Sequence, residues 1–214
     1  MYLACIFDLD GTLADSLRDL AEASNHALAA QGYPTHEIER YRYFVGNGIP
    51  KLIERVLPQD ACTPEILNRT RAIFDTYYEV HRLDHTAPYE GIVPLLDSLH
   101  EKGVKLAVVS NKPDVFAKKI VTTLFGDRFH PVFGNRPDVP RKPDPAAALE
   151  AATMLGVQPE ECLFLGDSGV DMKTAEAAKM TGVGVLWGFR DRDELLENGA
   201  KRLLARPEEL LELF

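Results

Sequence analysis

A short apolar run at residues 2–7 that stops abruptly at acidic residues constrains the fold of this chain most strongly. The run contains Ile, Phe and Tyr and is too short for a helix, so it predicts a buried parallel strand. It is followed at once by Asp8-Leu9-Asp10-Gly11-Thr12-Leu13, in which the glycine allows a sharp turn. Ligands of open α/β sheets bind at the carboxyl ends of the strands. We therefore expect a site here that holds a cation, attacks an electrophile, or does both.

The rest of the chain divides into two kinds of pattern. Residues 17–78 show helical spacing of apolar side chains and no convincing strand, whereas strand and helix patterns alternate from residue 88 onward. Further strands are predicted at residues 104–109, 131–133, 162–165, 182–186 and 202–204, with a helix after the last of them. This alternation is typical of an α/β fold, a Rossmann-like parallel sheet with helices on both faces. We expect that core to comprise residues 1–15 and 84–214, with an inserted all-helical cap at residues 16–83.

Composition and charge narrow the classes of partner. The formal net charge of the 214 residues is -9, and no Lys/Arg-rich run is present, which argues against nucleic-acid binding. No apolar stretch approaches membrane-spanning length, and Asp8 cuts short the only apolar run near the N-terminus, so neither a membrane partner nor a signal peptide is expected. The three cysteines, Cys5, Cys62 and Cys162, have no zinc-site or disulfide spacing. We expect a reduced, cytoplasmic protein.

Polar side chains stand at the ends of three predicted strands. Asp8 and Asp10 follow the first, Ser110 and Asn111 the second, and Asp167 the third. Two further candidates lie nearby in sequence: Lys142, in the loop before a predicted helix, and Asp171, near a helix start. If the three strands are neighbours in the sheet, these groups converge at one edge.

These residue types suit phosphoryl chemistry. Mg²⁺ prefers oxygen ligands, which the carboxylates of Asp8 and Asp167 would supply. A carboxylate can also act as a nucleophile and form an aspartyl-phosphate. Asp10 lies beyond the end of the predicted strand, so the turn and not the strand sets the direction of its side chain. The turn would have to aim this carboxyl group toward Asp8 before Asp10 could serve as general acid and base. Catalysis of phosphoryl transfer depends mainly on cations and hydrogen-bond donors placed around the phosphoryl group. Ser110 and Lys142 could supply such groups.

Four ordered motifs of this chain resemble those of the haloacid dehalogenase-like hydrolase superfamily. They are Asp8-Leu9-Asp10-Gly11-Thr12-Leu13, Ser110-Asn111, Lys142-Pro143-Asp144, and Gly166-Asp167-Ser168 with Asp171. The resemblance spans nearly the whole chain. It implies an Mg²⁺-dependent hydrolase in which the helical insertion is a mobile cap that closes over the substrate.

The resemblance also implies roles for single residues. Asp8 would be the nucleophile, Asp10 the general acid and base, and Lys142 would orient the phosphoryl group and balance its charge. The implied metal site comprises Asp8, the main-chain carbonyl of Asp10, Asp167 and Asp171. The phosphoryl group would be bound by Thr12, Ser110 and Asn111.

Within the superfamily, the chain is most similar to the phosphoglycolate phosphatase subgroup. One sign is a glycine-rich segment in the cap, which includes Arg42, Gly46, Asn47 and Gly48. The resemblance implies that this segment is a substrate-specificity loop, in which Arg42 either holds a substrate carboxylate or braces the loop. The chain departs from the subgroup at Asn135 and Ala200, where acidic residues are usual.

The expected activity is hydrolysis of a small phosphomonoester through an aspartyl-phosphate, with 2-phosphoglycolate as the leading substrate. Pyrophosphate, a nucleoside monophosphate or a sugar phosphate are alternative substrates, since a scaffold does not determine its substrate. A mutase similar to β-phosphoglucomutase is a further alternative, and a binding module that has lost catalysis is the alternative of another class. The protein is expected to be a monomer or a homodimer.

Overall fold

The structure, a computed structural model, describes all residues from 1 to 214. The chain forms two compact units, which are described separately. One, the core unit, comprises Met1–Ala14 and Pro88–Phe214, and the other, the helical unit, comprises Asp15–Ala87. Where the chain passes from one unit to the other, two very short strands, β2 (Ala14–Asp15) and β3 (Ala87–Pro88), form a sheet of their own.

A six-stranded sheet forms the centre of the core unit, in the order β5-β4-β1-β6-β7-β8. Every pair of neighbours is parallel, as the alternating sequence pattern predicts. The strands are β1 (Ala4–Phe7), β4 (Lys105–Pro113), β5 (Val132–Asn135), β6 (Cys162–Gly166), β7 (Thr181–Val185) and β8 (Arg202–Leu204). The central strands β1 and β6 are buried along their whole length, which explains why they read as continuous apolar runs.

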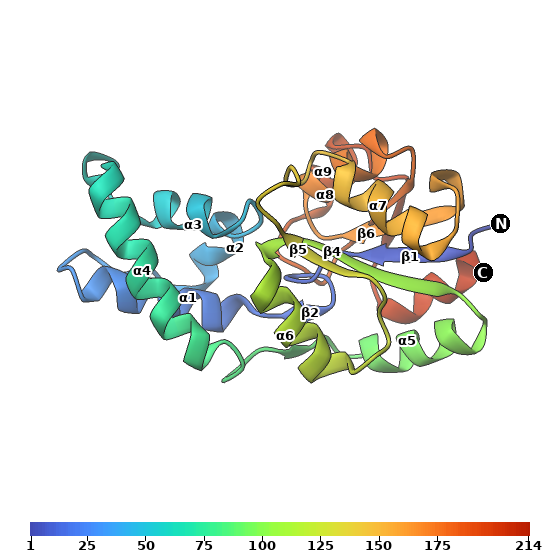
Figure 1. The fold of residues 1–214 in the computed structure, drawn as a ribbon, viewed down its shortest axis with the longest axis horizontal. Coiled ribbons are helices and arrows are strands. Elements are labelled where there is room, and N and C mark those ends of the chain that lie inside the picture. Colours follow the sequence, from blue (N-terminus) through green and yellow to red (C-terminus); the bar gives the residue numbers. More distant parts are fainter. The chain divides into compact units, whose positions relative to one another are not determined.

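Helices cover both faces of this sheet (Figure 1), so the predicted fold class is confirmed. One face carries α7 (Ala146–Leu155), α8 (Gly169–Ala177) and α9 (Arg192–Glu197). The other carries α5 (Ile92–Glu101), α6 (Asp114–Phe125) and the 3₁₀ helix η4 (Pro207–Leu213), and a short turn η3 (Pro159–Glu161) leads into β6. The small side chains of α7, among them Ala148, Ala151 and Ala152, pack on Ile6 and Phe164 of the sheet. Alanines at these positions let the helix approach the strands closely.

One strand of the core unit differs from the sequence prediction. The second predicted strand ends at residue 109, whereas β4 continues to Pro113 and includes Ser110, Asn111 and Lys112. The helix predicted after the last strand is present as the 3₁₀ helix η4. The polar residues at 110–112 hide the end of β4, because a strand with polar side chains at its end gives no apolar pattern.

The helical unit contains α1 (Leu17–Ala29), η1 (Ile38–Arg40), α2 (Tyr41–Phe44), α3 (Ile49–Val56), η2 (Gln59–Ala61) and α4 (Pro64–His81). The long helix α4 begins with Thr63 as N-cap, whose hydroxyl accepts a hydrogen bond from the Ile66 N–H, and with Pro64 in the first turn. It packs against α1 and buries Phe74 and Tyr78 completely. None of the helices in the chain has both the length and the apolar character needed to cross a membrane.

Candidate active site

The sheet order brings the three polar strand ends together. β1 lies between β4 and β6, so Asp8 and Asp167, which follow β1 and β6, lie at the same edge of the sheet as Ser110, near the end of β4. All three side chains are buried. This is the convergence that the sequence predicts, and it lies entirely within the core unit.

The Lys142 ammonium links two of the carboxylates. Its Nζ lies 2.9 Å from Oδ1 of Asp8 and 2.7 Å from Oδ1 of Asp171, and all three side chains are almost fully buried. The other oxygen of Asp171 accepts hydrogen bonds from the backbone N–H and the hydroxyl of Ser168, at 3.2 Å and 2.6 Å. Asp171 therefore holds Lys142 beside Asp8 and also takes part, with Ser168, in the capping box at the N-terminus of α8.

The buried carboxylates outnumber the cations beside them. Asp8, Asp167 and Asp171 each offer an oxygen within 4.8 Å of the others. Burial, opposed by Lys142 and reinforced by the charges of Asp171 and Asp10, raises the pKa of Asp8 to about 6. Burial and the charges of Asp171 and Asp8 raise the pKa of Asp167 well above its ordinary value. Burial lowers the pKa of Lys142, but the two aspartates outweigh that effect and raise it.

This excess of buried negative charge fits a divalent cation. Oxygen donors from carboxylates are what Mg²⁺ prefers, and a bound cation would offset the repulsion that raises both carboxyl pKa values. Asp8 and Asp167 are the better placed donors, because both oxygens of Asp171 already accept hydrogen bonds.

Two glycines make room for Asp167. A Cβ built on Gly11 or on Gly188 would collide with the Asp167 side chain, and Gly11 also has a φ of +84°. The Phe189 N–H donates to Oδ2 of Asp167 at 2.7 Å, and the Trp187 indole N–H donates to the Thr12 carbonyl at 3.0 Å. Residues 187–189 thus form one wall of the site.

Asp10 has a partner that sequence reasoning missed. The Lys112 ammonium lies 2.9 Å and 3.1 Å from the two carboxylate oxygens of Asp10, and its side chain is 0% exposed. A signal was available, because Lys112 is two residues beyond Ser110 on the same strand and side chains at that spacing share a side.

The other predicted site residues of the core unit, Asn111, Ser110 and Thr12, differ in their hydrogen bonds. The amide of Asn111 donates to the Lys142 carbonyl at 3.1 Å, which ties the end of β4 to the lysine loop. The Ser110 hydroxyl accepts from the Lys112 N–H at 3.3 Å. The Thr12 hydroxyl is fully buried and has no hydrogen-bond partner.

The predicted cap residues all belong to the helical unit. Arg42 forms an ion pair with Glu39 at 2.7 Å, and its side chain is 39% exposed. Gly46 and Gly48 have φ values of +118° and +80°, so the turn between α2 and α3 uses the freedom of both. The guanidinium of Arg55, another residue that sequence reasoning missed, donates to the Phe44 carbonyl at 2.9 Å and to Oδ1 of Asn47 at 2.7 Å.

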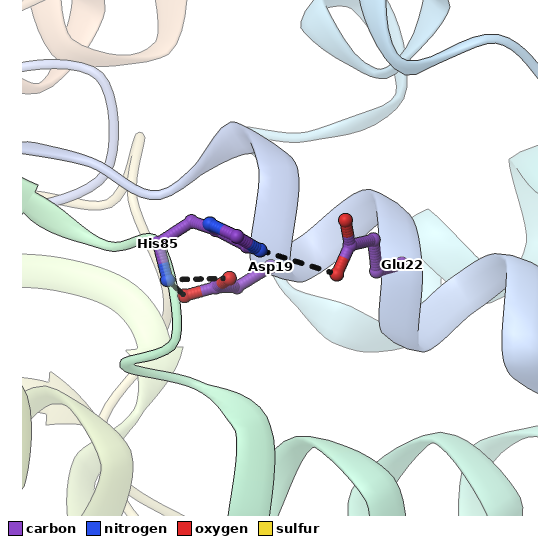
Figure 2. Close-up of side chains that lie close together, drawn as sticks. All are labelled: Asp19, Glu22 and His85. Atoms are coloured by element: carbon purple, nitrogen blue, oxygen red, sulfur yellow. Dashed lines mark hydrogen bonds and ion pairs between the residues drawn. The ribbon is translucent and has the colours of Figure 1, made fainter.

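A second acidic cluster lies in the helical unit and has a structural explanation (Figure 2). The Asp19 carboxylate accepts the backbone N–H groups of His85 and Thr86 and the Thr86 hydroxyl, at 2.6–3.1 Å. The His85 ring lies 3.7 Å from Glu22. These bonds tie residues 85–86 to helix α1.

Comparisons with known proteins agree with this geometry. The family model of haloacid dehalogenase-like hydrolases matches residues 2–179. A phosphoglycolate phosphatase of Pseudomonas putida is 38% identical over 194 residues, which is 86% of this chain and 69% of the relative. A phosphoglycolate phosphatase of Aquifex aeolicus is 32% identical over 98% of this chain and 95% of its own.

Solved structures agree as well. A Lactobacillus delbrueckii protein, provisionally named a phosphoglycolate phosphatase, superimposes with a TM-score of 0.94 at 33% identity, over 99% of this chain and 98% of its own. A Pseudomonas syringae hydrolase superimposes with a TM-score of 0.77 at 32% identity, over 99% and 97%. The sheet order, the order of the motifs along the chain and these matches lead to one conclusion: the chain belongs to the haloacid dehalogenase-like hydrolases.

Proposed function

We propose that this protein is an Mg²⁺-dependent phosphatase that hydrolyses a small phosphomonoester through a phosphorylated Asp8, and that 2-phosphoglycolate is its substrate. The observation that carries the proposal is the position of Asp8. Its carboxylate stands at the end of the central strand, 2.9 Å from the Lys142 ammonium and beside the carboxylates of Asp167 and Asp171. A carboxylate held in this way is suited to attack phosphorus, while the neighbouring cation stabilises the phosphoryl oxygens.

The proposed reaction has two steps. In the first, an oxygen of Asp8 forms a bond to phosphorus, the bond from phosphorus to the ester oxygen breaks, and the Asp10 carboxyl gives its proton to the departing oxygen. In the second, a water attacks phosphorus and gives its proton to Asp10, and the bond between phosphorus and Asp8 breaks. Lys142 offsets charge on the phosphoryl oxygens in both steps, and Asp171 and Asn111 support the lysine from its two ends.

In this proposal the metal site uses Asp8, Asp167 and the main-chain carbonyl of Asp10, with Asp171 in a supporting position. Bound there, Mg²⁺ would supply positive charge against the phosphoryl oxygens and would relieve the repulsion between the buried carboxylates. Ser110 and the Thr12 hydroxyl are the proposed phosphoryl-binding groups in the core. The Thr12 hydroxyl is suited to this role, because a buried hydroxyl without a partner is costly unless a ligand supplies one.

The substrate assignment rests on the relatives, several of which are phosphoglycolate phosphatases. We propose that residues 16–83, which lie within the helical unit, are the cap of this enzyme, inserted between the two parts of the core. Arg42, Gly46, Asn47 and Gly48 would then form its specificity loop. Arg55 supports this reading, because it holds the backbone and the asparagine of that loop in one shape.

The test is phosphate release from a panel of phosphate compounds, with Mg²⁺ and with EDTA. The panel contains 2-phosphoglycolate, ethyl phosphate, glucose 1-phosphate, a nucleoside monophosphate and pyrophosphate. We expect Mg²⁺-dependent release with the highest kcat/KM on 2-phosphoglycolate. A higher kcat/KM on another compound would overturn the substrate, and no release from any of them would overturn the phosphatase assignment.

A further inference from the structure

We propose that the side-chain amide nitrogen of Asn47 binds the carboxylate of the substrate, and that Arg55 is the positioning residue that fixes the orientation of this amide. The inference rests on the proposed function and assigns one atom of the specificity loop to substrate recognition. The preference for an acidic phosphate ester then depends on which way a single amide group faces.

The Arg55 guanidinium holds the segment between α2 and α3 at several points. It donates to the carbonyls of Tyr43 and Phe44, at 3.4 Å and 2.9 Å, and to Oδ1 of Asn47, at 2.7 Å. Asn47 lies between two glycines with positive φ values, where the backbone alone permits many conformations. The hydrogen bond from Arg55 is therefore what fixes the Asn47 side chain.

The chemistry of these two groups dictates which way the Asn47 amide faces. A guanidinium carries N–H donors and no acceptor, so the atom that meets it must be the amide oxygen. The amide nitrogen, with its two N–H donors, then points away from Arg55. This nitrogen has no hydrogen-bond partner in the structure. Asn47 is also partly exposed, so a ligand can reach the free donors.

Free N–H donors select for ligands that carry an acceptor. A carboxylate has acceptor oxygens only, whereas an ammonium has donors only and a methyl group has neither. The Arg55 guanidinium on the amide oxygen strengthens the donors on the amide nitrogen, because linked hydrogen bonds polarise one another. An ester whose tail lacks an acceptor forfeits this bond, which is how a polar site discriminates against an analogue.

A purely structural role for the same contacts is the alternative. In that case Arg55 only braces the end of α2, and Asn47 only supplies it with an acceptor. Aspartate at position 47 separates the two roles. It has nearly the shape of asparagine and keeps an oxygen for Arg55, but it replaces the N–H donors with a second acceptor. Asn47→Asp therefore preserves the brace and removes the donors.

The experiment compares kcat/KM for 2-phosphoglycolate and for ethyl phosphate, which lacks the carboxylate. Its readout is the ratio of the two values, the carboxylate preference, because a general loss of activity cancels from it. The variants are Asn47→Asp, Asn47→Leu, which removes the donors without adding a charge, and Arg55→Met, which frees the amide to rotate. Asn68→Asp is the control, since it adds the same charge at an exposed position of α4 in the same unit.

We expect Asn47→Asp and Asn47→Leu to lower the carboxylate preference about 10- to 100-fold, as the loss of one hydrogen bond to a charged group predicts. Arg55→Met should lower it by a smaller factor, because the amide can still turn toward the carboxylate. Asn68→Asp should keep it.

Three results would overturn the inference. If Asn47→Asp keeps the preference, the contact with Arg55 is only structural. If Asn47→Asp lowers it and Asn47→Leu does not, repulsion by the added charge explains the loss. If Arg55→Met leaves the preference unchanged, Arg55 does not position the amide.

The same measurement separates this inference from the function on which it rests. A wild-type enzyme that shows no preference for 2-phosphoglycolate over ethyl phosphate would remove both the proposed substrate and the role of Asn47. A wild-type preference that persists in both Asn47 variants would leave the proposed function standing and remove only the role of Asn47.

Discussion

At the scale of single residues, the surroundings of Asp8 make a direct prediction. Its carboxylate is the proposed nucleophile, and asparagine has nearly the same shape but cannot form the phosphoryl ester in its place. We expect Asp8→Asn to lower kcat for phosphate release by at least about 10³-fold, which is the scale seen when a nucleophile is removed.

Asp138→Asn is the control for this variant, because Asp138 is exposed and lies outside the site. Steady-state kinetics with 2-phosphoglycolate and Mg²⁺ provide the measurement. Activity of Asp8→Asn within tenfold of the wild type would contradict the assigned nucleophile.

Buried carboxyl groups predict a pH dependence of stability for the metal-free protein. Burial raises the pKa of Asp8 to about 6, so the folded state holds this proton more tightly than the unfolded state does. The contribution of Asp8 to the free energy of unfolding is therefore greatest below the ordinary carboxyl pKa, and it falls as pH rises toward 6.

We test this by urea unfolding of the wild type and of Asp8→Asn in EDTA, from pH 4 to pH 7.5. The wild type should lose stability relative to the variant as pH rises through this range. If the two stability curves run parallel, Asp8 is not the strained carboxyl group that the structure describes.

The sequence predicts which side chains form the site better than it predicts which groups they contact. Asp8, Ser110, Lys142 and Asp167 can be located from strand ends and motifs alone. Lys112 is harder to locate, because a lysine after an apolar run usually marks the point where a strand reaches solvent, and only its spacing from Ser110 points to the site. The structure buries it, since β4 continues for several residues past the apolar run.

At the scale of elements, the turn after β1 predicts the effect of a glycine substitution. Gly11 has a φ of +84°, and a Cβ there would meet the carboxylate of Asp167. Gly103 has a similar φ of +74°, but a Cβ there would meet nothing within 4 Å. Alanine at either position should therefore lower the free energy of unfolding by a similar amount, about 1–2 kcal/mol, because of its positive φ. Only Gly11→Ala also displaces a proposed metal ligand.

We expect Gly11→Ala to raise the Mg²⁺ concentration needed for half-maximal activity at least tenfold, and Gly103→Ala to leave it unchanged. Mg²⁺ titrations of phosphatase activity provide the measurement. An equal response of the two variants would show that the cost lies in the backbone and not in the contact with Asp167.

The hydrogen bonds that tie residues 85–86 to helix α1 predict how a substitution of Asp19 changes stability. Asp19 accepts the N–H of His85 (Figure 2) and also the N–H of the next residue, Thr86. Asp19→Ala would leave the buried Thr86 N–H and the partly buried His85 N–H without their acceptor, which costs about 2–3 kcal/mol in the free energy of unfolding.

Glu22→Gln is the matched control on the same helix. Glu22 is partly exposed and pairs with Arg18 and His85, so we expect its loss to cost less than about 1 kcal/mol. Urea unfolding of the two variants compares them. A cost for Asp19→Ala as small as that of Glu22→Gln would show that the carboxylate does not tie residues 85–86 to helix α1.

Sequence patterns predict long apolar elements well and their ends poorly. The strand and helix periodicities of the core are visible because each element buries one or both faces. The strands β2 and β3 are only two residues long and carry no apolar pattern. The final helix is predicted from the sequence without a type, because spacing alone does not separate a 3₁₀ helix from an α helix over so few residues.

At the scale of the whole molecule, the order of the strands does most to build the site. Motifs more than a hundred residues apart in the sequence meet because β4 and β6 flank β1. Parallel topology could be predicted from the alternation of strands and helices, and the positions of the motifs then implied a common edge. What could not be predicted are contacts made by backbone groups, such as the Phe189 N–H on Asp167, because they depend on the path of a loop and leave no mark in residue type.

The measurement that tests the central claim most directly is mass spectrometry of the protein quenched in acid during turnover of 2-phosphoglycolate with Mg²⁺. The wild type is compared with Asp10→Asn, in which hydrolysis of the phosphorylated enzyme should be slowed. We predict a phosphoryl group on the peptide that contains Asp8, at higher occupancy in Asp10→Asn. Consumption of the substrate with no phosphoryl group on Asp8, or with one on another residue, would contradict the account.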